Sequence, residues 1–100
     1  MLVFHRKSGQ GAEIKHKVSG RTYSIDYMYL EGNGAHLRIN NVEIKRQLNR
    51  PFYLDEDEEV MVVPIQKDSS FRLGIDASKS VWNIRRKEVA ETVATKPQMN

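Results

Sequence analysis

The sequence predicts a mainly β protein, built as a small antiparallel sheet or barrel of short strands. The first observation is the alternation of apolar and polar residues, which is clearest over residues 22–30 and 71–75. The second is the Gly-Asn-Gly turn signal at residues 32–34, because glycine and asparagine tolerate the positive φ angles of tight turns. The third is a nearly unbroken apolar run over residues 60–65, which is typical of a buried strand.

The first expected strand covers residues 2–7 and stops at the Ser-Gly-Gln-Gly break over residues 8–11. Leu2, Phe4 and Arg6 would share one face of it, since successive side chains of a strand point to opposite faces.

A β-hairpin is expected next, over residues 22–40, with its turn at the glycines. Asn41 is then a candidate N-cap for a short helix over residues 42–49, which Pro51 would prevent from continuing. A strand over residues 42–45 is the alternative for this segment.

The second half of the chain predicts three strands, over residues 60–65, 71–75 and 80–86. Pro64 indicates an edge position or a bulge, because proline cannot donate a backbone hydrogen bond. A short helix over residues 87–95 and a flexible tail over residues 96–100 would complete the chain. Residues 1–95 are expected to form a single domain, since 100 residues suffice for one and not comfortably for two.

Charge and composition favour some partners over others. The net charge is +3, with Lys and Arg gathered in residues 1–21 and 79–87 and an acidic run at residues 55–59. Two basic ends would form one nucleic-acid-binding face if the fold joined them, and ordinary solvated charges are the alternative. Cysteine is absent, and no apolar stretch approaches the roughly 18–20 residues of a membrane span, so we expect a cytoplasmic protein without disulfides.

Catalytic and metal-binding patterns are not found in the sequence. His5, His16 and His36 match no common metal-ligand spacing, and the acidic run lacks the ligand spacing of a calcium loop. No nucleophile–base pair or paired carboxylates suggest a reaction. The sequence therefore predicts a protein that is not an enzyme and needs no cofactor or metal.

Several segments resemble the carbon storage regulator (CsrA/RsmA) family. Met-Leu-Val-Phe-His-Arg-Lys-Ser-Gly at residues 1–9 is similar to that family's opening, which is Met-Leu, a short apolar strand and then Thr-Arg-Lys/Arg-x-Gly-Glu. Glu59, Val60 and the apolar strand that follows resemble its third strand. Residues 71–81 resemble its Val-Arg-Ile-Gly-Ile-Asn-Ala-Pro-Lys-x-Val segment, and residues 84–89 its Val-His-Arg-Glu-Glu-Ile. The resemblance spans residues 1–10 and about 52–93.

This resemblance implies a small bacterial post-transcriptional regulator. Members of the family form an interleaved homodimer with strand exchange, so that the first strand of one chain lies beside the last strand of the other. Each edge so formed binds a GGA-containing hairpin in an mRNA leader or a small regulatory RNA, and translation or mRNA stability changes. By this resemblance the RNA-binding residues are Phe4, Arg6, Lys7, Ile84 and Arg86.

The chain departs from the family most clearly at residues 11–50, where the family has only a short turn. This insertion would be an extra hairpin and helix that cap the sheet, an additional RNA surface, or a partner-binding arm. Trp82-Asn83 adds one residue to the last strand, as a β-bulge would. Either Arg85 or Arg86 is then the key arginine, and Arg86 is favoured because it keeps the family's Arg-x-Glu-Ile spacing.

Sequence-specific RNA binding is the leading hypothesis from the sequence. The main alternative is a protein-interaction module on the same fold, whose insertion blocks the RNA edge or recruits a protein partner. A weaker alternative is a non-specific single-strand binder, with Tyr23, Tyr27, Tyr29 and Trp82 as stacking platforms, although alternating tyrosines in a strand are more often packing residues.

Overall fold

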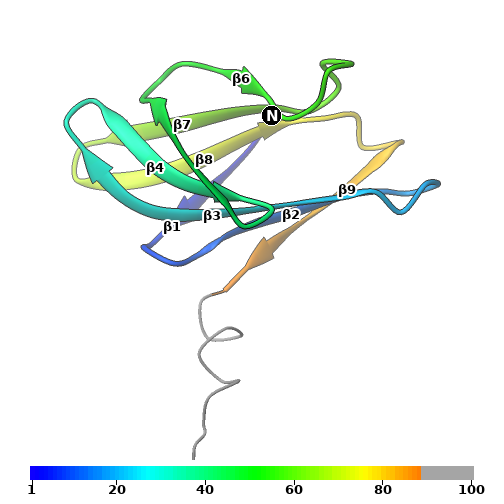
Figure 1. The fold of residues 1–100 in the computed structure, drawn as a ribbon, viewed down its shortest axis with the longest axis horizontal. Coiled ribbons are helices and arrows are strands. Elements are labelled where there is room, and N and C mark those ends of the chain that lie inside the picture. The colour runs from blue at the N-terminus through cyan, green and yellow to red at the C-terminus, as the bar shows by residue number, and fades with distance from the viewer. Residues whose placement is uncertain (89–100) are drawn as a thin grey trace, which may run out of the picture.

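The computed structural model describes residues 1–88, which form two antiparallel sheets (Figure 1). The strands are β1 (Leu2–Arg6), β2 (Gly11–His16), β3 (Thr22–Glu31), β4 (Gly34–Ile39), β5 (Val42–Gln47), β6 (Phe52–Tyr53), β7 (Met61–Lys67), β8 (Ser70–Asp76) and β9 (Trp82–Lys87). The four-stranded sheet has the order β1-β8-β7-β6, and the five-stranded sheet has the order β5-β4-β3-β2-β9. The mainly β prediction is confirmed.

Two pairings join strands that are far apart in the sequence. β1 pairs with β8, with Leu2 opposite Ile75, and β9 pairs with β2, with Trp82 opposite His16. All other pairings join strands that follow one another along the chain. The first and last strands therefore belong to different sheets, and each forms an edge of its sheet.

The core lies between the two sheets. Alternate side chains of each sheet turn inward, and the ring of Tyr27 from β3 stacks on that of Phe71 from β8, with centroids 3.8 Å apart. The buried apolar side chains come from both layers: Ala12, Ile14, Ile25, Tyr27, Ala35, Leu37, Val60, Val62, Phe71, Leu73, Ile75 and Trp82. Because both sheets contribute, neither layer buries its apolar face alone.

The helix expected over residues 42–49 is wrong, because this segment is strand β5. Asn40 and Asn41 both have positive φ angles, 49° and 69°. Two such residues in succession make the tight turn that matches the twist of a β-hairpin, so Asn41 directs the chain back along β4 instead of capping a helix. The alternative strand is correct, and it extends to Gln47.

The insertion at residues 11–50 builds most of the second layer. It contains β2, β3, β4 and β5, which are all the strands of the five-stranded sheet except β9. The expected β-hairpin over residues 22–40 is confirmed as β3 and β4, whereas β2 was not predicted. Its signal was present, since Ala12 and Ile14 are buried and alternate with polar neighbours.

Two details near the ends of strands can be compared with expectation. The β-bulge expected at Trp82-Asn83 is wrong, because β9 pairs with β2 in continuous register. The edge position expected for Pro64 is confirmed: the short β6 reaches only as far as Val62, so no strand lies beside Pro64 on that side. Its carbonyl instead accepts a hydrogen bond from the backbone N–H of Asn49.

The C-terminal helix expected over residues 87–95 does not begin where predicted, because Lys87 is the last residue of β9. Residues 89–100, with the rest of that helix and the expected tail, lie outside the described residues. The interleaved dimer is not shown either, since β1 and β9 find their pairing partners within one chain. Residues 1–88 contain no helix with the length and apolar character needed to cross a bilayer.

Candidate nucleic-acid interface

The edge strands β1 and β9 lie side by side in the single chain without pairing with each other. The guanidinium of Arg86 lies over the ring of Phe4, 5.5 Å from its centroid. Next to this contact, where both strands end, Arg6 Nη1 donates a hydrogen bond to the carbonyl of Lys87, at 3.0 Å. We call this arrangement the β1–β9 seam, formed by residues 2–6 and 82–88. One chain thus brings together the first and last strands that the resemblance places on two chains.

The open edge of β9 presents backbone groups of Ile84 and Arg86. The N–H of Lys17 donates to the carbonyl of Val81, which fixes the side on which β9 pairs with β2. Backbone groups alternate in direction along a strand, so those of odd-numbered residues face β2 and those of Ile84 and Arg86 face away from it. These groups are available to a ligand along the seam.

The open edge of β1 presents Val3 and His5 by the same rule. The carbonyl of Pro64 bonds to Asn49 and so points away from β8. Leu73, opposite Pro64, must then turn its backbone groups toward its other partner in β1, which leaves those of Val3 and His5 on the open side. The His5 carbonyl already accepts a hydrogen bond from Arg6 Nε, so the groups that remain for a binding partner are the His5 N–H and those of Val3.

The two candidate arginines point to opposite faces of β9. Arg86 is opposite Ala12, whose side chain is buried between the sheets, so Arg86 lies on the inner face and reaches Phe4 of β1. Arg85 lies on the outer face, where its Nε donates to Glu13 Oε1 at 2.7 Å. The arginine that faces the seam is therefore Arg86.

Arg6 is turned into the protein, and its side chain is only 7% exposed. Its Nη1 donates to the carbonyls of Gly11 and Lys87 and to the carboxylate of Glu88, at 3.0–3.2 Å. Its Nε bonds to the carbonyl of His5. Arg6 thus ties the end of β1 to β2 and β9, and these donors are already occupied within the chain.

The other predicted residues differ in position. Phe4 is half-buried with its ring between β1 and Arg86, and Ile84 is half-buried opposite Ile14 of β2. Lys7 follows β1, is exposed, and lines a separate pocket of about 500 Å³ formed with β3 and the turn between β7 and β8. The structure therefore gathers Phe4, Ile84 and Arg86 at the seam and leaves Lys7 beyond its end.

A pocket of about 280 Å³ lies at the end of the seam where both strands begin. Its walls come from the two strands and from two loops: Leu2, Lys17, Lys79, Trp82, Asn83 and Ile84. Sequence reasoning did not select Lys17 or Lys79 as site residues, although both belong to the basic segments at the two ends of the chain. The pocket combines an apolar floor with a cationic rim.

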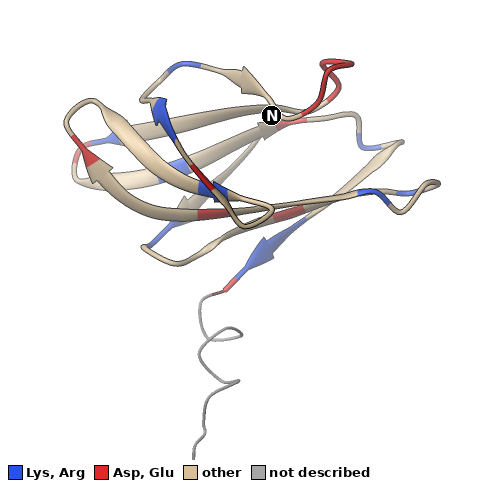
Figure 2. Ribbon diagram, in the orientation of Figure 1, with Lys and Arg blue, Asp and Glu red and all other residues tan. Residues whose placement is uncertain are grey.

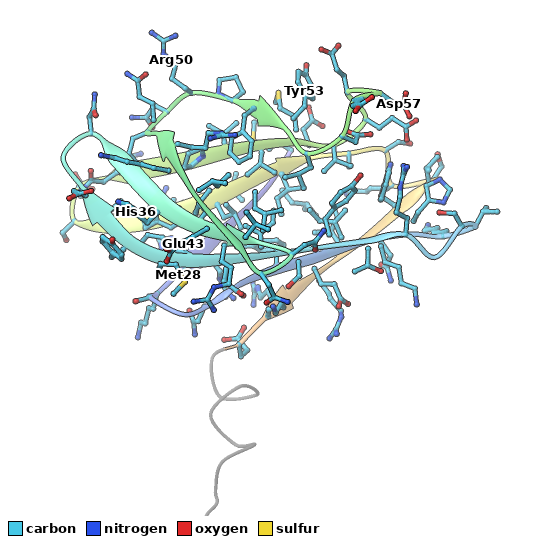
Figure 3. The ribbon with its side chains drawn as sticks, viewed as in Figure 1. Met28, His36, Glu43, Arg50, Tyr53 and Asp57 are labelled. Atoms are coloured by element: carbon cyan, nitrogen blue, oxygen red, sulfur yellow. The ribbon has the colours of Figure 1, made fainter. Side chains whose placement is uncertain are left out.

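Figure 2 shows that the acidic run is gathered in the loop between β6 and β7. In sheet order β8 and β7 separate this loop from β1. Oxygen atoms of Asp55, Asp57 and Glu59 lie within 4.8 Å of one another. The Asp55 carboxylate accepts hydrogen bonds from the backbone N–H groups of Glu59 and Val60, so it closes the loop. Figure 3 shows Arg50, Tyr53 and Asp57 extending outward on this side of the molecule.

The aromatic residues mostly pack within the protein. Trp82 is 2% exposed and contacts His16 and Tyr23, with ring centroids 4.9 and 5.9 Å away. Tyr27 is also buried, and burial raises the pKa of its phenol above the ordinary value. Tyr29 is half exposed and stacks on His36. Packing is thus confirmed for Tyr27 and Trp82.

No protein-family model, curated protein or solved structure matches the chain.

Proposed function

We propose that this chain is a sequence-specific RNA-binding post-transcriptional regulator whose binding site is the β1–β9 seam. Its ligands are GGA-containing hairpins in mRNA leaders or small RNAs, and binding alters translation or mRNA stability. The observation that carries the proposal is that two unpaired strand edges, with Arg86 over Phe4, lie together at the positions for which the family resemblance implies RNA contact.

The chemistry of the seam suits unstacked bases in a hairpin loop. Loop bases expose hydrogen-bonding edges that backbone N–H and C=O groups along an open strand can recognise. The Arg86 guanidinium offers a planar set of donors for a guanine or a phosphate, and the Phe4 ring beneath it holds its plane. Ile84 adds an apolar surface beside the pocket.

In this proposal Arg6 is a positioning residue, which sets the relative placement of β1 and β9. By bonding to the Gly11 and Lys87 carbonyls, it fixes the separation of the two edges. A seam held at one width favours specific recognition, because less conformational freedom is lost when RNA binds.

A cytoplasmic homodimer is part of the proposal. Because one chain contains both edges, each protomer would carry a complete seam, and the dimer would bind two hairpins at equal sites. Sedimentation of the protein alone measures the number of chains in the particle. Sedimentation with a saturating hairpin measures the number of hairpins bound to it. A stoichiometry of one RNA per two chains would contradict a complete seam in each protomer.

The decisive experiment is a titration of the purified protein with a hairpin RNA that has GGA in its loop, beside the same hairpin with GGA changed. We expect tight binding that is lost on the change. Equal affinity for both hairpins would leave only non-specific single-strand binding, with strong salt dependence and no sequence preference. Absence of binding to both would overturn the proposal.

Arg86→Gln and Arg85→Gln form a matched pair for the same assay. We expect Arg86→Gln to weaken GGA binding by roughly 10- to 100-fold, which corresponds to the loss of one specific contact of about 1–3 kcal/mol. Arg85→Gln removes the same charge from the neighbouring position on the outer face, and should change affinity by less than about threefold. Equal effects of the two substitutions would argue against recognition at the seam.

If the chain is instead a protein-interaction module, RNA is not its ligand. Neither Arg86→Gln nor Arg85→Gln would then alter its function by weakening RNA binding. In that alternative the insertion would cover the RNA edge or recruit a protein partner. The inserted strand β2 pairs with the other side of β9, which leaves the side facing β1 open and favours the RNA proposal.

A further inference from the structure

Three cationic side chains gather beside the pocket at the beginning of the seam. Lys17 and Lys79 line the pocket, and Lys17 Nζ donates to the carbonyl of Lys79 at 2.6 Å. The guanidinium of Arg21 lies over Trp82, which also lines the pocket, 5.5 Å from the ring centroid, and over Tyr23 at 6.0 Å. Lys17 and Arg21 both belong to the turn that joins β2 to β3, within the insertion.

The β2–β3 turn is held by hydrogen bonds at both of its ends. His16 N–H donates to the Arg21 carbonyl, and Gly20 N–H donates to the His16 carbonyl. His16 Nδ1 accepts from the N–H groups of Val18 and Ser19. The turn is also tied to the loop before β9 through Lys17, so Lys17 and Arg21 sit on a prearranged support.

These cations have no acidic neighbour in the part of the chain that the structure describes. No carboxylate oxygen of residues 1–88 lies within 4.0 Å of Lys17, Arg21 or Lys79, whereas Arg85 and Lys87 at the other end of β9 are paired with Glu13 and Asp26. The acidic loop is across the four-stranded sheet, beyond β8 and β7 from the seam. An anion that approaches the pocket therefore meets positive charge that is not neutralised by an adjacent carboxylate.

We propose that Lys17 and Arg21, with Lys79, form a clamp for the phosphodiester groups of the RNA strand whose bases occupy the seam. This inference rests on the proposed function and deepens it. The clamp lies at the end of the seam where β1 and β9 begin, beyond Leu2 and Ile84, so it holds nucleotides that flank the recognised bases. Arginine and lysine bind phosphates without reading the base, so the clamp raises affinity for any sequence and leaves discrimination to the seam.

The clamp gives the inserted sheet a direct part in RNA binding. Its turn brings two cations next to the last strand, a placement that follows from the pairing of β2 with β9. A protein lacking this insertion would have no counterpart of Lys17 or Arg21 at this place.

Lys15 provides a matched control on the same strand. It is exposed and lies on the outer face of β2, opposite Asn83, two residues before Lys17. Lys15→Gln removes one charge from the same region without touching the clamp. We compare it with Lys17→Gln and with the double variant Lys17→Gln/Arg21→Gln, using the GGA hairpin and the changed hairpin over a range of salt concentrations.

The expected result is a change in affinity and in salt dependence, without a change in specificity. The slope of log K against log salt should become shallower by about one for each phosphate contact removed, and the double variant should bind both RNAs about tenfold more weakly at physiological salt. The ratio of affinities for the two hairpins should stay the same. Lys15→Gln should keep nearly the wild-type slope.

The outcomes separate this inference from the proposed function. If Lys17→Gln and the double variant keep the affinity and slope of Lys15→Gln while the wild type still selects GGA, the clamp is wrong and the function stands. If the wild type binds both hairpins equally, sequence specificity is wrong, but a shallower slope in the variants still supports the clamp. If the wild type binds no RNA, both are overturned. Circular dichroism verifies that each variant is folded, and Lys17→Gln tests the clamp even if removing Arg21 from Trp82 unfolds the protein.

Discussion

The two sheets of this protein differ in how far their sequences resemble the CsrA/RsmA family, and the seam lies where they meet. The four-stranded sheet is made entirely of segments on which the family resemblance rests, residues 1–10 and 52 onward. The five-stranded sheet is made of the insertion, except for its edge strand β9. β9 is therefore a family-like strand that an inserted strand, β2, pairs with and holds in place.

This difference shows how one chain can build an interface for which the resemblance implies two. The first and last strands need separate neighbours that leave their facing edges open. β1 pairs with β8, and β9 pairs with β2. The insertion thus supplies the neighbouring strand that a second chain would otherwise provide. The comparison predicts that damage to the inserted sheet will disturb the proposed RNA site from a distance.

The largest expected effect is at Gly11, where the inserted sheet is most tightly built. A Cβ atom at this position would lie 1.6 Å from the carbonyl oxygen of Ile25, so β2 would have to move away from β3. We expect Gly11→Ala to lower the free energy of unfolding by about 3 kcal/mol or more, in the range of severe overpacking. Urea unfolding of the wild type and of Gly11→Ala measures this difference in the free energy of unfolding.

Gly34→Ala is the control for this prediction within the same sheet. A Cβ atom there would meet the flexible side chain of Lys45, which can move aside. Its cost should stay below about 1 kcal/mol. Equal stability of the two variants would mean that the close contact between β2 and β3 does not constrain this sheet.

The second effect is at Arg6, which joins the two sheets at the end of the seam. Arg6→Met removes a buried guanidinium and leaves the carbonyls of Gly11 and Lys87 without that donor. We expect a loss of about 2 kcal/mol in the free energy of unfolding, typical of hydrogen bonds to a charged group. A variant as stable as the wild type would contradict the structural part assigned to Arg6.

Sequence reasoning succeeded for strands with strong alternation and failed where turn chemistry decided the outcome. The segments that became β1, β3, β7 and β8 alternate or are continuously apolar, so pattern alone located them. The segment after Asn41 has apolar residues compatible with either a helix or a strand, and the positive φ angles of Asn40 and Asn41 selected the hairpin. Asparagine tolerates such angles but is also a common N-cap, so residue type alone left both structures open.

The candidate site was predictable only in part for a similar reason. Phe4, Ile84 and Arg86 followed from a resemblance and do lie together. The inward turn of Arg6 depends on carbonyls of β2 and β9, which only the three-dimensional pairing brings near. The position of Lys17 beside Lys79 also depends on the pairing of β2 with β9. Lys17 and Lys79 are more than sixty positions apart in the sequence, so spacing along the chain does not reveal this contact.

A third and smaller effect measures how firmly the two sheets are coupled. Tyr27 of the inserted sheet stacks on Phe71 of the other sheet, with their planes 6° apart. In a double-mutant cycle with Tyr27→Leu and Phe71→Leu, we expect a coupling energy of about 1 kcal/mol in unfolding, as for other aromatic pairs. Additive losses would show that the sheets are held by burial alone and not by this stacked pair.

The smallest expected effect is at Glu31, an exposed residue at the end of β3 in the inserted sheet. The hydrogen bond between Glu31 and His36, at 2.7 Å, and then the charge of Lys45 hold the pKa of Glu31 below its ordinary value of 4.5. A carboxyl whose pKa is lower in the folded chain stabilises it at pH above 4.5, and this contribution is lost as the pH falls through the lowered pKa. Carbon-detected NMR titration should therefore give a Glu31 midpoint below 4.5. His36→Phe keeps an aromatic ring beside Tyr29 and removes the hydrogen bond, so it should raise that midpoint more than Lys45→Gln does. A midpoint that neither substitution moves would show that this hairpin's charges act independently.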